Sequence, residues 1–283
     1  MTTTPTTVSP NEEPTVYSWG SFSITFQGKK ASVRHHRFGP APTKIGAKRK
    51  QISWFSFQAR RRLLRKIAVW DFNAIGRSLF ITLTYPDEIP LPDQDTRNKQ
   101  RYIFHRHFEQ YYNMHIPAIW RIEWERRKSG ANIGQVYPHW HMLMLGPRFI
   151  AYQHINDYWR KVIGCEGYCR TEIQGSYGHH TAPMYIGKYL GKIQCTLSLV
   201  YGAYHNIHGR HWGILRDKEI PLCEMTEVVD LAQDEKEFCL EFGRQYFDEF
   251  PEDGSQSFTI LGKAAEELRE QFYKIRLAKA LGA

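Results

Sequence analysis

The stretch YPHWHMLML, residues 137–145, decides the fold of the central part of this chain. Apolar side chains surround two histidines, His139 and His141, in a pattern typical of a β-strand buried in a sheet. Successive residues of a strand point to opposite faces, so both imidazoles leave one face, and Trp140 and Met142 leave the other. Two histidines placed this way are either structural residues of a half-buried strand or a pair of metal ligands on a rigid support.

The segments around this strand predict an antiparallel sheet with flanking helices. Residues 118–126, AIWRIEWER, form a second strand, joined to the first by a hairpin loop over 128–136. Residues 78–85, SLFITLTY, form a buried third strand that ends at Pro86. Further strands are expected at 168–174 and 209–214, and helices at 56–72, 98–114, 150–163 and 181–194. This order predicts an α+β fold with a central antiparallel sheet and ferredoxin-like, RRM-like connectivity.

The two ends of the chain differ in composition from this central part. Residues 1–50 begin with a Thr- and Pro-rich stretch that has little to bury. A short strand or hairpin is expected at 16–26, and a basic arm follows it. Two helices are expected near the C-terminus, over 224–248 and 257–281. We therefore expect three regions: a disordered, basic N-terminal arm, a central domain over 51–216 and an acidic helical region over 217–283.

Charge is distributed unevenly along the chain. The formal net charge is +9, but residues 1–216 carry 30 Lys and Arg against 13 Asp and Glu, and residues 217–283 carry 8 against 16. A body this basic indicates either a polyanionic partner, most simply nucleic acid, or only a soluble basic surface. The sequence shows no run of 18 apolar residues and no secretory pattern, so no membrane association is expected. Five cysteines without a C-x-x-C pair suit a reducing cytoplasm.

Glu123 brings a third potential ligand to the two histidines. It lies on the strand that pairs antiparallel with the histidine strand, and its parity places it on the same face as both imidazoles. Two imidazoles and one carboxylate make a site for a divalent ion, Mg²⁺ or Mn²⁺, that leaves positions open for water or substrate. Glu125 has the same parity and is the second choice for this carboxylate.

A pair of tyrosines lies in YIGKYLGK, residues 185–192. Tyr185 and Tyr189 are four residues apart, as are Lys188 and Lys192, so on a helix each pair shares a face. A tyrosine can attack phosphorus and hold the product as a phosphotyrosyl ester, and a nearby ammonium group would lower its pKa or stabilise the phosphate. The same spacing also fits an amphipathic helix with two half-buried tyrosines.

Three stretches, taken in order, resemble the motifs of HUH endonucleases, the rolling-circle replication initiators of small single-stranded DNA phages and plasmids. They are FITLTY (80–85), PHWHMLML (138–145) and YIGKYLGK (185–192). The paired tyrosines look like the phage branch of the family, and GRHWG (209–213) resembles a segment that follows the tyrosine helix there. The resemblance covers roughly residues 52–215, and three ordered motifs are more specific than any one of them.

The resemblance implies metal-dependent nicking and joining of single-stranded DNA at a replication origin. A metal ion on His139, His141 and Glu123 would orient the scissile phosphate. Tyr185 or Tyr189 would attack it, which leaves a 5′-phosphotyrosyl bond and a free 3′-OH. After one round the other tyrosine would cleave the regenerated origin, and the 3′-OH would rejoin the held 5′ end.

The resemblance also implies supporting residues and partners. Lys188 and Lys192 are carried over as phosphate or tyrosinate partners, whereas Thr82 and Thr84 belong to the first motif, whose role is mainly structural. The sequence shows no GxxxxGK[ST], so a host helicase would separate the strands and a host polymerase would extend the 3′-OH, in the cytoplasm of a bacterial cell. Two other functions fit the same residues: a non-catalytic single-stranded nucleic-acid-binding protein, and a metal nuclease that uses water as nucleophile.

Overall fold

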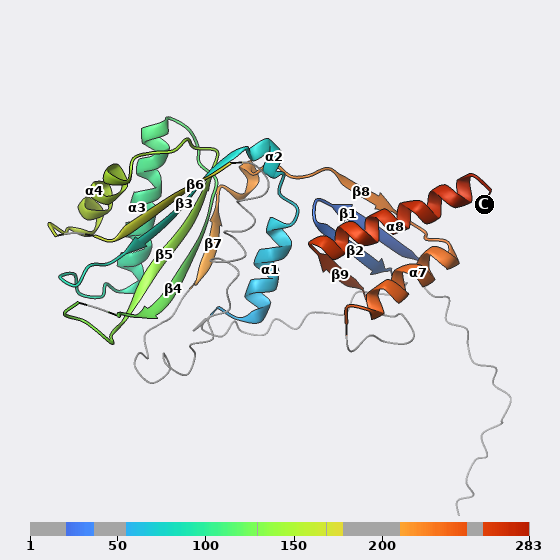
Figure 1. Ribbon diagram of the computed structural model, residues 1–283, viewed down its shortest axis with the longest axis horizontal. Coiled ribbons are helices and arrows are strands. Elements are labelled where there is room, and N and C mark those ends of the chain that lie inside the picture. The colour runs from blue at the N-terminus through green and yellow to red at the C-terminus, as the bar shows by residue number, and fades with distance from the viewer. Residues whose placement is uncertain are drawn as a thin grey trace, which may run out of the picture. The chain divides into compact units, whose positions relative to one another are not determined.

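The computed structural model describes residues 21–36, 55–128, 130–167, 169–177, 210–247 and 257–282. The chain divides into two compact units, one formed by residues 46–224 and the other by 1–45 together with 225–283 (Figure 1). The described elements are β1 (Phe22–Gln27), β2 (Lys30–His35), α1 (Phe57–Ile67), α2 (Phe72–Ile75), β3 (Arg77–Thr84), α3 (Gln94–Tyr112), β4 (Ala118–Arg126), β5 (Val136–Leu145), α4 (Tyr152–Ile163), β6 (Thr171–Tyr177), β7 (Trp212–Leu215), a 3₁₀ turn (Asp217–Glu219), β8 (Met225–Val228), α7 (Gln233–Arg244), β9 (Phe258–Leu261) and α8 (Lys263–Ala280). None of the helices in these ranges combines the length and the hydropathy that a bilayer crossing requires.

The larger unit is built on a five-stranded sheet in the order β6-β3-β5-β4-β7. Every neighbouring pair is antiparallel, so the predicted α+β class with an antiparallel sheet is confirmed. The predicted hairpin of β4 and β5 is also confirmed, with Glu123 directly opposite His139 and Arg121 directly opposite His141. β7 corresponds to the strand expected at 209–214 and lies at the edge of the sheet, and both β6 and β7 begin slightly later than the sequence indicated.

Helices α3 and α4 cover one face of this sheet (Figure 1). Phe104 and Phe108 of α3 and Trp159 of α4 pack against alternate residues of the strands to form the main core. Trp140, between the two histidines, is almost completely buried in this core. Burial of such large rings is the main stabilising contribution, at about 25 cal/mol per Å² of apolar surface. The alternation predicted for β5 therefore anchors one side of the strand and leaves the histidines on the other.

Helix α1 covers one end of the opposite face. The hydroxyl of Ser56 caps this helix by accepting a hydrogen bond from the amide of Ala59, at 3.1 Å. Leu63 and Ile67, four residues apart, pack onto the sheet against residues that include Leu143 of β5. The basic residues Arg61, Arg62, Arg65 and Lys66 of the helix stay outside this contact and are exposed. The other end of the same sheet face carries the two histidines.

The smaller unit combines the two ends of the chain. Its sheet has the order β8-β1-β2-β9, so the N-terminal hairpin pairs with one C-terminal strand on each side. Ile24 and Phe26 of β1 pack with Leu268 and Phe272 of α8 in a separate core. The sequence predicts an N-terminal arm and a separate C-terminal helical region, but in the structure the two ends of the chain form one unit. The expectation of two uninterrupted C-terminal helices is corrected, because strands β8 and β9 occupy part of the predicted helical ranges.

Candidate active site

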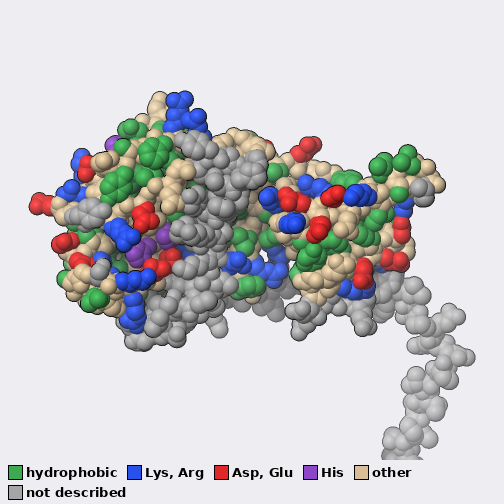
Figure 2. Space-filling model, in the orientation of Figure 1, with side chains coloured by type: hydrophobic (Ala, Val, Ile, Leu, Met, Phe, Trp, Pro, Cys, Tyr) green, Lys and Arg blue, Asp and Glu red, His purple; other side chains and the backbone are tan. Residues whose placement is uncertain are grey.

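The candidate site is a cleft of about 650 Å³ on the sheet face opposite α3 and α4. It is bordered by residues of β3, β4, β5 and β6, and it includes both histidines and Glu123. Figure 2 shows histidine side chains at the surface of this unit, between acidic and basic side chains. A cleft with mixed charges and imidazoles is the type of surface on which a metal ion or a phosphate binds.

The register of the strands arranges the site residues in two rows across the sheet. In one row, Thr82 of β3, His141 of β5 and Arg121 of β4 are direct cross-strand partners. In the next row, His139 of β5 is the direct partner of Glu123 on β4. Directly paired residues of an antiparallel sheet have Cβ atoms about 4.5–5.5 Å apart. The predicted parity of Glu123 therefore brings its carboxylate within reach of both histidine rings.

His141 and Glu123 are in contact. Nε2 of His141 lies 3.1 Å from Oε2 of Glu123, and both side chains are more than nine-tenths buried. Two donor atoms that each bind one ion at about 2.1 Å lie roughly 3 Å apart. This pair therefore has the spacing of two ligands of one metal ion, and the imidazole and carboxylate are suitable donors for it.

His139 lies beside this pair and is less deeply buried. Burial lowers the pKa of His139 below its ordinary value, while the carboxylate of Glu125 acts in the opposite direction. The ring is therefore uncharged at pH 7, the form in which histidine binds metals. Within the described ranges, no three His, Cys, Asp or Glu side chains gather closely enough to form a complete metal site. The structure joins His141 to Glu123, with His139 on the same face and Glu125 exposed at the edge.

Thr82 orients the ring of His141. Its hydroxyl oxygen lies 3.1 Å from Nδ1 of His141, and a hydroxyl can either donate or accept a hydrogen bond. When Nε2–H donates to Glu123, the hydroxyl donates to Nδ1. When Nε2 offers its lone pair to a metal ion, Nδ1–H donates to the hydroxyl. The sequence singled out Thr82 only as part of the first motif, with a mainly structural role. It did not reveal this contact, because the pairing of β3 with β5 was not known.

Charged residues from other elements complete the cleft. Arg170 and Glu172, at the start of β6, form an ion pair in which Nη2 of Arg170 lies 3.1 Å from Oε1 of Glu172. The sequence did not identify these two residues, because no pattern distinguishes them. Arg127 extends from the hairpin loop, pairs with Asp87 and stacks over a tyrosine ring. The cleft thus presents cations suited to a phosphate next to carboxylates suited to a metal ion.

Four predicted site residues, Tyr185, Lys188, Tyr189 and Lys192, lie outside the described residues. In comparisons with known proteins, no family model and no curated protein matches the chain. A function is therefore inferred from the cleft and from the order of the sequence motifs.

Proposed function

We propose that this protein is an HUH-type endonuclease that initiates rolling-circle replication by nicking and rejoining single-stranded DNA. The observation that carries the proposal is the contact between His141 and Glu123 in an open cleft, with His139 beside them. These residues come from two paired strands, one of which contains the second HUH-like motif. The antiparallel sheet with helices on it is compatible with the ferredoxin-like, RRM-like core of that family.

The donor set suits Mg²⁺ or Mn²⁺. Carboxylate oxygens bind both ions, and neutral imidazole favours Mn²⁺. His139, His141 and Glu123 would hold the ion, with Glu125 as the second choice for the carboxylate. When bound, the ion supplies Lewis-acid polarisation of a phosphodiester oxygen. Thr82 keeps the ring of His141 in the orientation that this role requires.

Tyr185 or Tyr189 supplies the nucleophile in this proposal. The phenolic oxygen loses its proton and attacks the scissile phosphorus, and the bond from phosphorus to the 3′ oxygen breaks. The 3′ oxygen takes up a proton and becomes the primer end, while the 5′ phosphate stays esterified to the tyrosine. Lys188 and Lys192 stabilise the phenolate or the phosphate. The second tyrosine cleaves the regenerated origin. The 3′-OH freed by this cleavage then loses its proton and attacks the phosphorus of the first phosphotyrosyl ester. The bond from phosphorus to the tyrosine oxygen breaks, that oxygen takes up a proton, and a circle closes.

A covalent-adduct assay tests the proposal. The protein is incubated with Mn²⁺ and a labelled, sequence-randomised pool of single-stranded DNA, and adducts are separated on a denaturing gel. We expect an adduct from the wild type and none from the double variant Tyr185→Phe/Tyr189→Phe, which should still bind DNA. The control Tyr102→Phe/Tyr111→Phe removes two exposed phenols of α3, outside the cleft, and should form adducts normally.

Other outcomes of the adduct assay would favour one of the two rival functions. An adduct from the double Phe variant would refute the tyrosine assignment. Cleavage by the wild type without any adduct would indicate a nuclease that uses water, and binding without cleavage would indicate a non-catalytic DNA-binding protein. His141→Ala should abolish cleavage because the metal ion loses a ligand, and added Mn²⁺ should not restore it.

A further inference from the structure

A second cavity, of about 390 Å³, lies between α1 and β7 on the same sheet face as the candidate site. We call this cavity the α1–β7 groove. Its described lining includes three basic side chains and two aromatic rings: Arg62, Lys66, Arg210, Phe55 and Trp212. The three basic residues are exposed, so their charges reach a ligand that enters from solvent. Cations interleaved with aromatic rings are typical of surfaces that bind single-stranded nucleic acid.

His211 adds a buried polar group to this groove. The residue is only 4% exposed, and neither of its ring nitrogens has a hydrogen-bond partner in the described part of the chain. An unpaired buried donor is costly, so a site for a ligand or a water is expected at such a ring. His211 also borders a gap of about 10 Å³, which has room for about one water molecule. Of these two cavities, the α1–β7 groove is the one with room for a ligand larger than a water molecule.

The protonation state of His211 leaves it able to donate one hydrogen bond. Burial, together with the charges of Arg121 and Arg97, lowers the pKa of His211 to about 4. The ring is therefore neutral at pH 7 and carries one N–H. The three flanking cations supply the charge for an anion, and the imidazole supplies a directional hydrogen bond.

The groove lies next to the candidate active site along one row of the sheet. Trp212 of β7 is the direct partner of Arg121, which is the direct partner of His141. Neighbouring strands are about 4.8 Å apart, and one strand, β4, lies between β7 and β5, so two strand spacings place Trp212 about 10 Å from His141. At about 3.4 Å per stacked nucleotide, roughly three nucleotides cover this distance. The guanidinium of Arg121 is buried, 4.4 Å from the centroid of the Phe55 ring, and it places a positive charge between the α1–β7 groove and the candidate active site.

We infer that the α1–β7 groove binds the phosphate backbone of the single-stranded DNA about three nucleotides from the scissile position, with a base against Trp212. This inference rests on the proposed function, because it assigns the path of that DNA. Arg62, Lys66 and Arg210 contact the phosphates. Lys66 also pairs with Asp217, but both side chains are about half exposed and solvent weakens the ion pair, so a phosphate can replace the carboxylate.

Two matched pairs of substitutions on α1 test the inference. Arg62→Ala/Lys66→Ala removes two charges that line the groove. Arg61→Ala/Arg65→Ala removes two exposed charges, also one helical turn apart, that do not line it. Binding of a fluorescent oligo-dT of about 16 nucleotides is measured by anisotropy at several salt concentrations. We expect the groove variant to bind about 10-fold more weakly, with a slope of log K against log salt reduced by about 1.4, and the control to change about 2-fold.

A third variant separates loss of the cation from loss of the ion pair. Asp217→Asn breaks the same ion pair with Lys66 but removes a negative charge, so it should bind oligo-dT at least as tightly as the wild type. Weaker binding by this variant would mean that the ion pair, rather than the cation, matters, and would overturn the inference. Thermal unfolding of each variant confirms that it is folded.

The remaining outcomes distinguish this inference from the proposed function. If the groove variant and the control variant lose oligo-dT affinity equally, the inference about the groove is wrong. The proposed function is not affected by that result, because it is tested by adduct formation. Tight binding of oligo-dT that depends on Arg62 and Lys66, in a protein that forms no covalent adduct, would support the groove and overturn the nicking reaction.

Discussion

The hydroxyl of Thr82 supports His141 through one hydrogen bond, and a single substitution tests its role. Thr82→Val keeps the shape of the side chain but leaves Nδ1 of His141 without this partner. Loss of such an outer contact commonly weakens metal binding by about 10- to 100-fold, and we expect an effect in that range for Mn²⁺, measured by calorimetry. Thr84→Val is the control, because the hydroxyl of Thr84 donates to the carbonyl of Arg170 instead. Equal Mn²⁺ affinities of the two variants would contradict the role assigned to Thr82.

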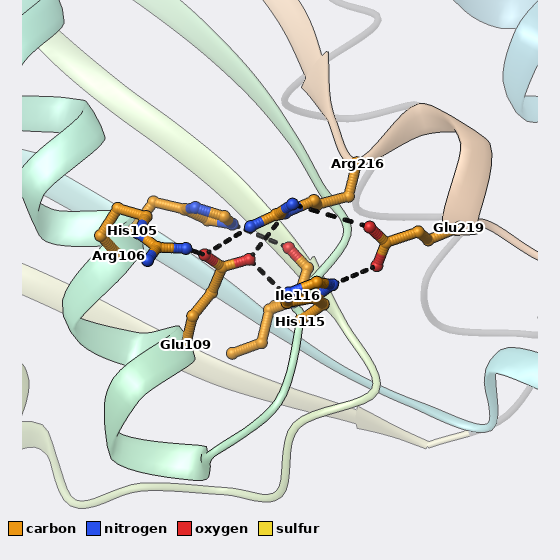
Figure 3. A network of polar contacts seen from close by, with 7 residues as sticks. All are labelled: His105, Arg106, Glu109, His115, Ile116, Arg216 and Glu219. Carbon is orange, nitrogen blue, oxygen red and sulfur yellow. Dashed lines mark hydrogen bonds and ion pairs between the residues drawn. The ribbon is translucent and has the colours of Figure 1, made fainter.

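Glu109 of α3 is the centre of a polar network in the same unit (Figure 3). Its carboxylate accepts hydrogen bonds from Arg216 at 2.9 Å, from Arg106 at 2.6 Å and from the amide of Ile116 at 3.2 Å. Burial by itself would raise the pKa of Glu109, but these hydrogen bonds outweigh burial and lower the pKa to about 2. The network links the C-terminal part of α3 to the segments before β4 and after β7.

The low pKa of Glu109 predicts how the stability of the fold depends on pH. Because the pKa in the folded state lies below the ordinary value of 4.5, the stabilisation is complete above that pH and is lost as the pH falls towards 2. Glu109→Gln should therefore lower the free energy of unfolding by about 3 kcal/mol at neutral pH, and by much less in acid. Glu219→Gln, which changes a more exposed partner of Arg216, should cost less than about 1 kcal/mol. Urea denaturation at neutral and at acidic pH measures these differences. If Glu109→Gln lowers the free energy of unfolding equally at both, the low pKa of Glu109 is contradicted.

At the level of the element, the β4–β5 hairpin shows why its loop is longer than the tightest turns. Asp87, in the turn after β3, accepts a hydrogen bond from the amide of Ala131 at 2.8 Å and pairs with Arg127. Gly130 has a φ of 90°, and a Cβ atom there would lie 2.1 Å from Oδ2 of Asp87. The loop is therefore fastened to β3 at the rim of the cleft, and this attachment requires a glycine.

Two glycines of this loop provide a matched test of the attachment. Gly134 has a similar φ of 82°, but a Cβ atom there would meet no other atom within 4 Å. Gly134→Ala should cost about 1 kcal/mol from backbone strain alone. Gly130→Ala should cost about 2–3 kcal/mol, because Asp87 must also give up its contacts with the loop. Thermal unfolding compares the two variants, and equal costs would show that Asp87 does not hold the loop.

For the whole molecule, the smaller unit depends on both ends of the chain. Within the described residues, β8 pairs with β1 and β9 pairs with β2, so the hairpin lies between the two C-terminal strands. A fragment of residues 225–283 should be unfolded by itself and should gain structure when mixed with a peptide of residues 21–36. A fragment of residues 46–224 has its own cores and should unfold cooperatively by itself. Circular dichroism during denaturation measures each case, and a folded fragment 225–283 without the peptide would contradict the pairing.

The sequence by itself determined the elements whose signal is local. The alternation in AIWRIEWER and YPHWHMLML placed Trp140 in the core and put His139, His141 and Glu123 on one face, as the register of the hairpin confirms. A strand pattern is set by the side chains of a few consecutive residues, and a hairpin joins neighbours in the chain, so both can be inferred without knowledge of distant segments. The order of the three motifs supplied the proposed reaction.

Only the tertiary structure decided which distant segments meet. Local periodicity contains no information about which strand pairs with which, so the contact of Thr82 with His141 and the place of Glu172 at the cleft were not predicted. Strands β8 and β9 span four residues each, too short for a recognisable alternation, and they form because the N-terminal hairpin offers its two free edges. The α1–β7 groove arises in the same way, because residues about 150 positions apart in the chain come together only when β7 pairs with β4.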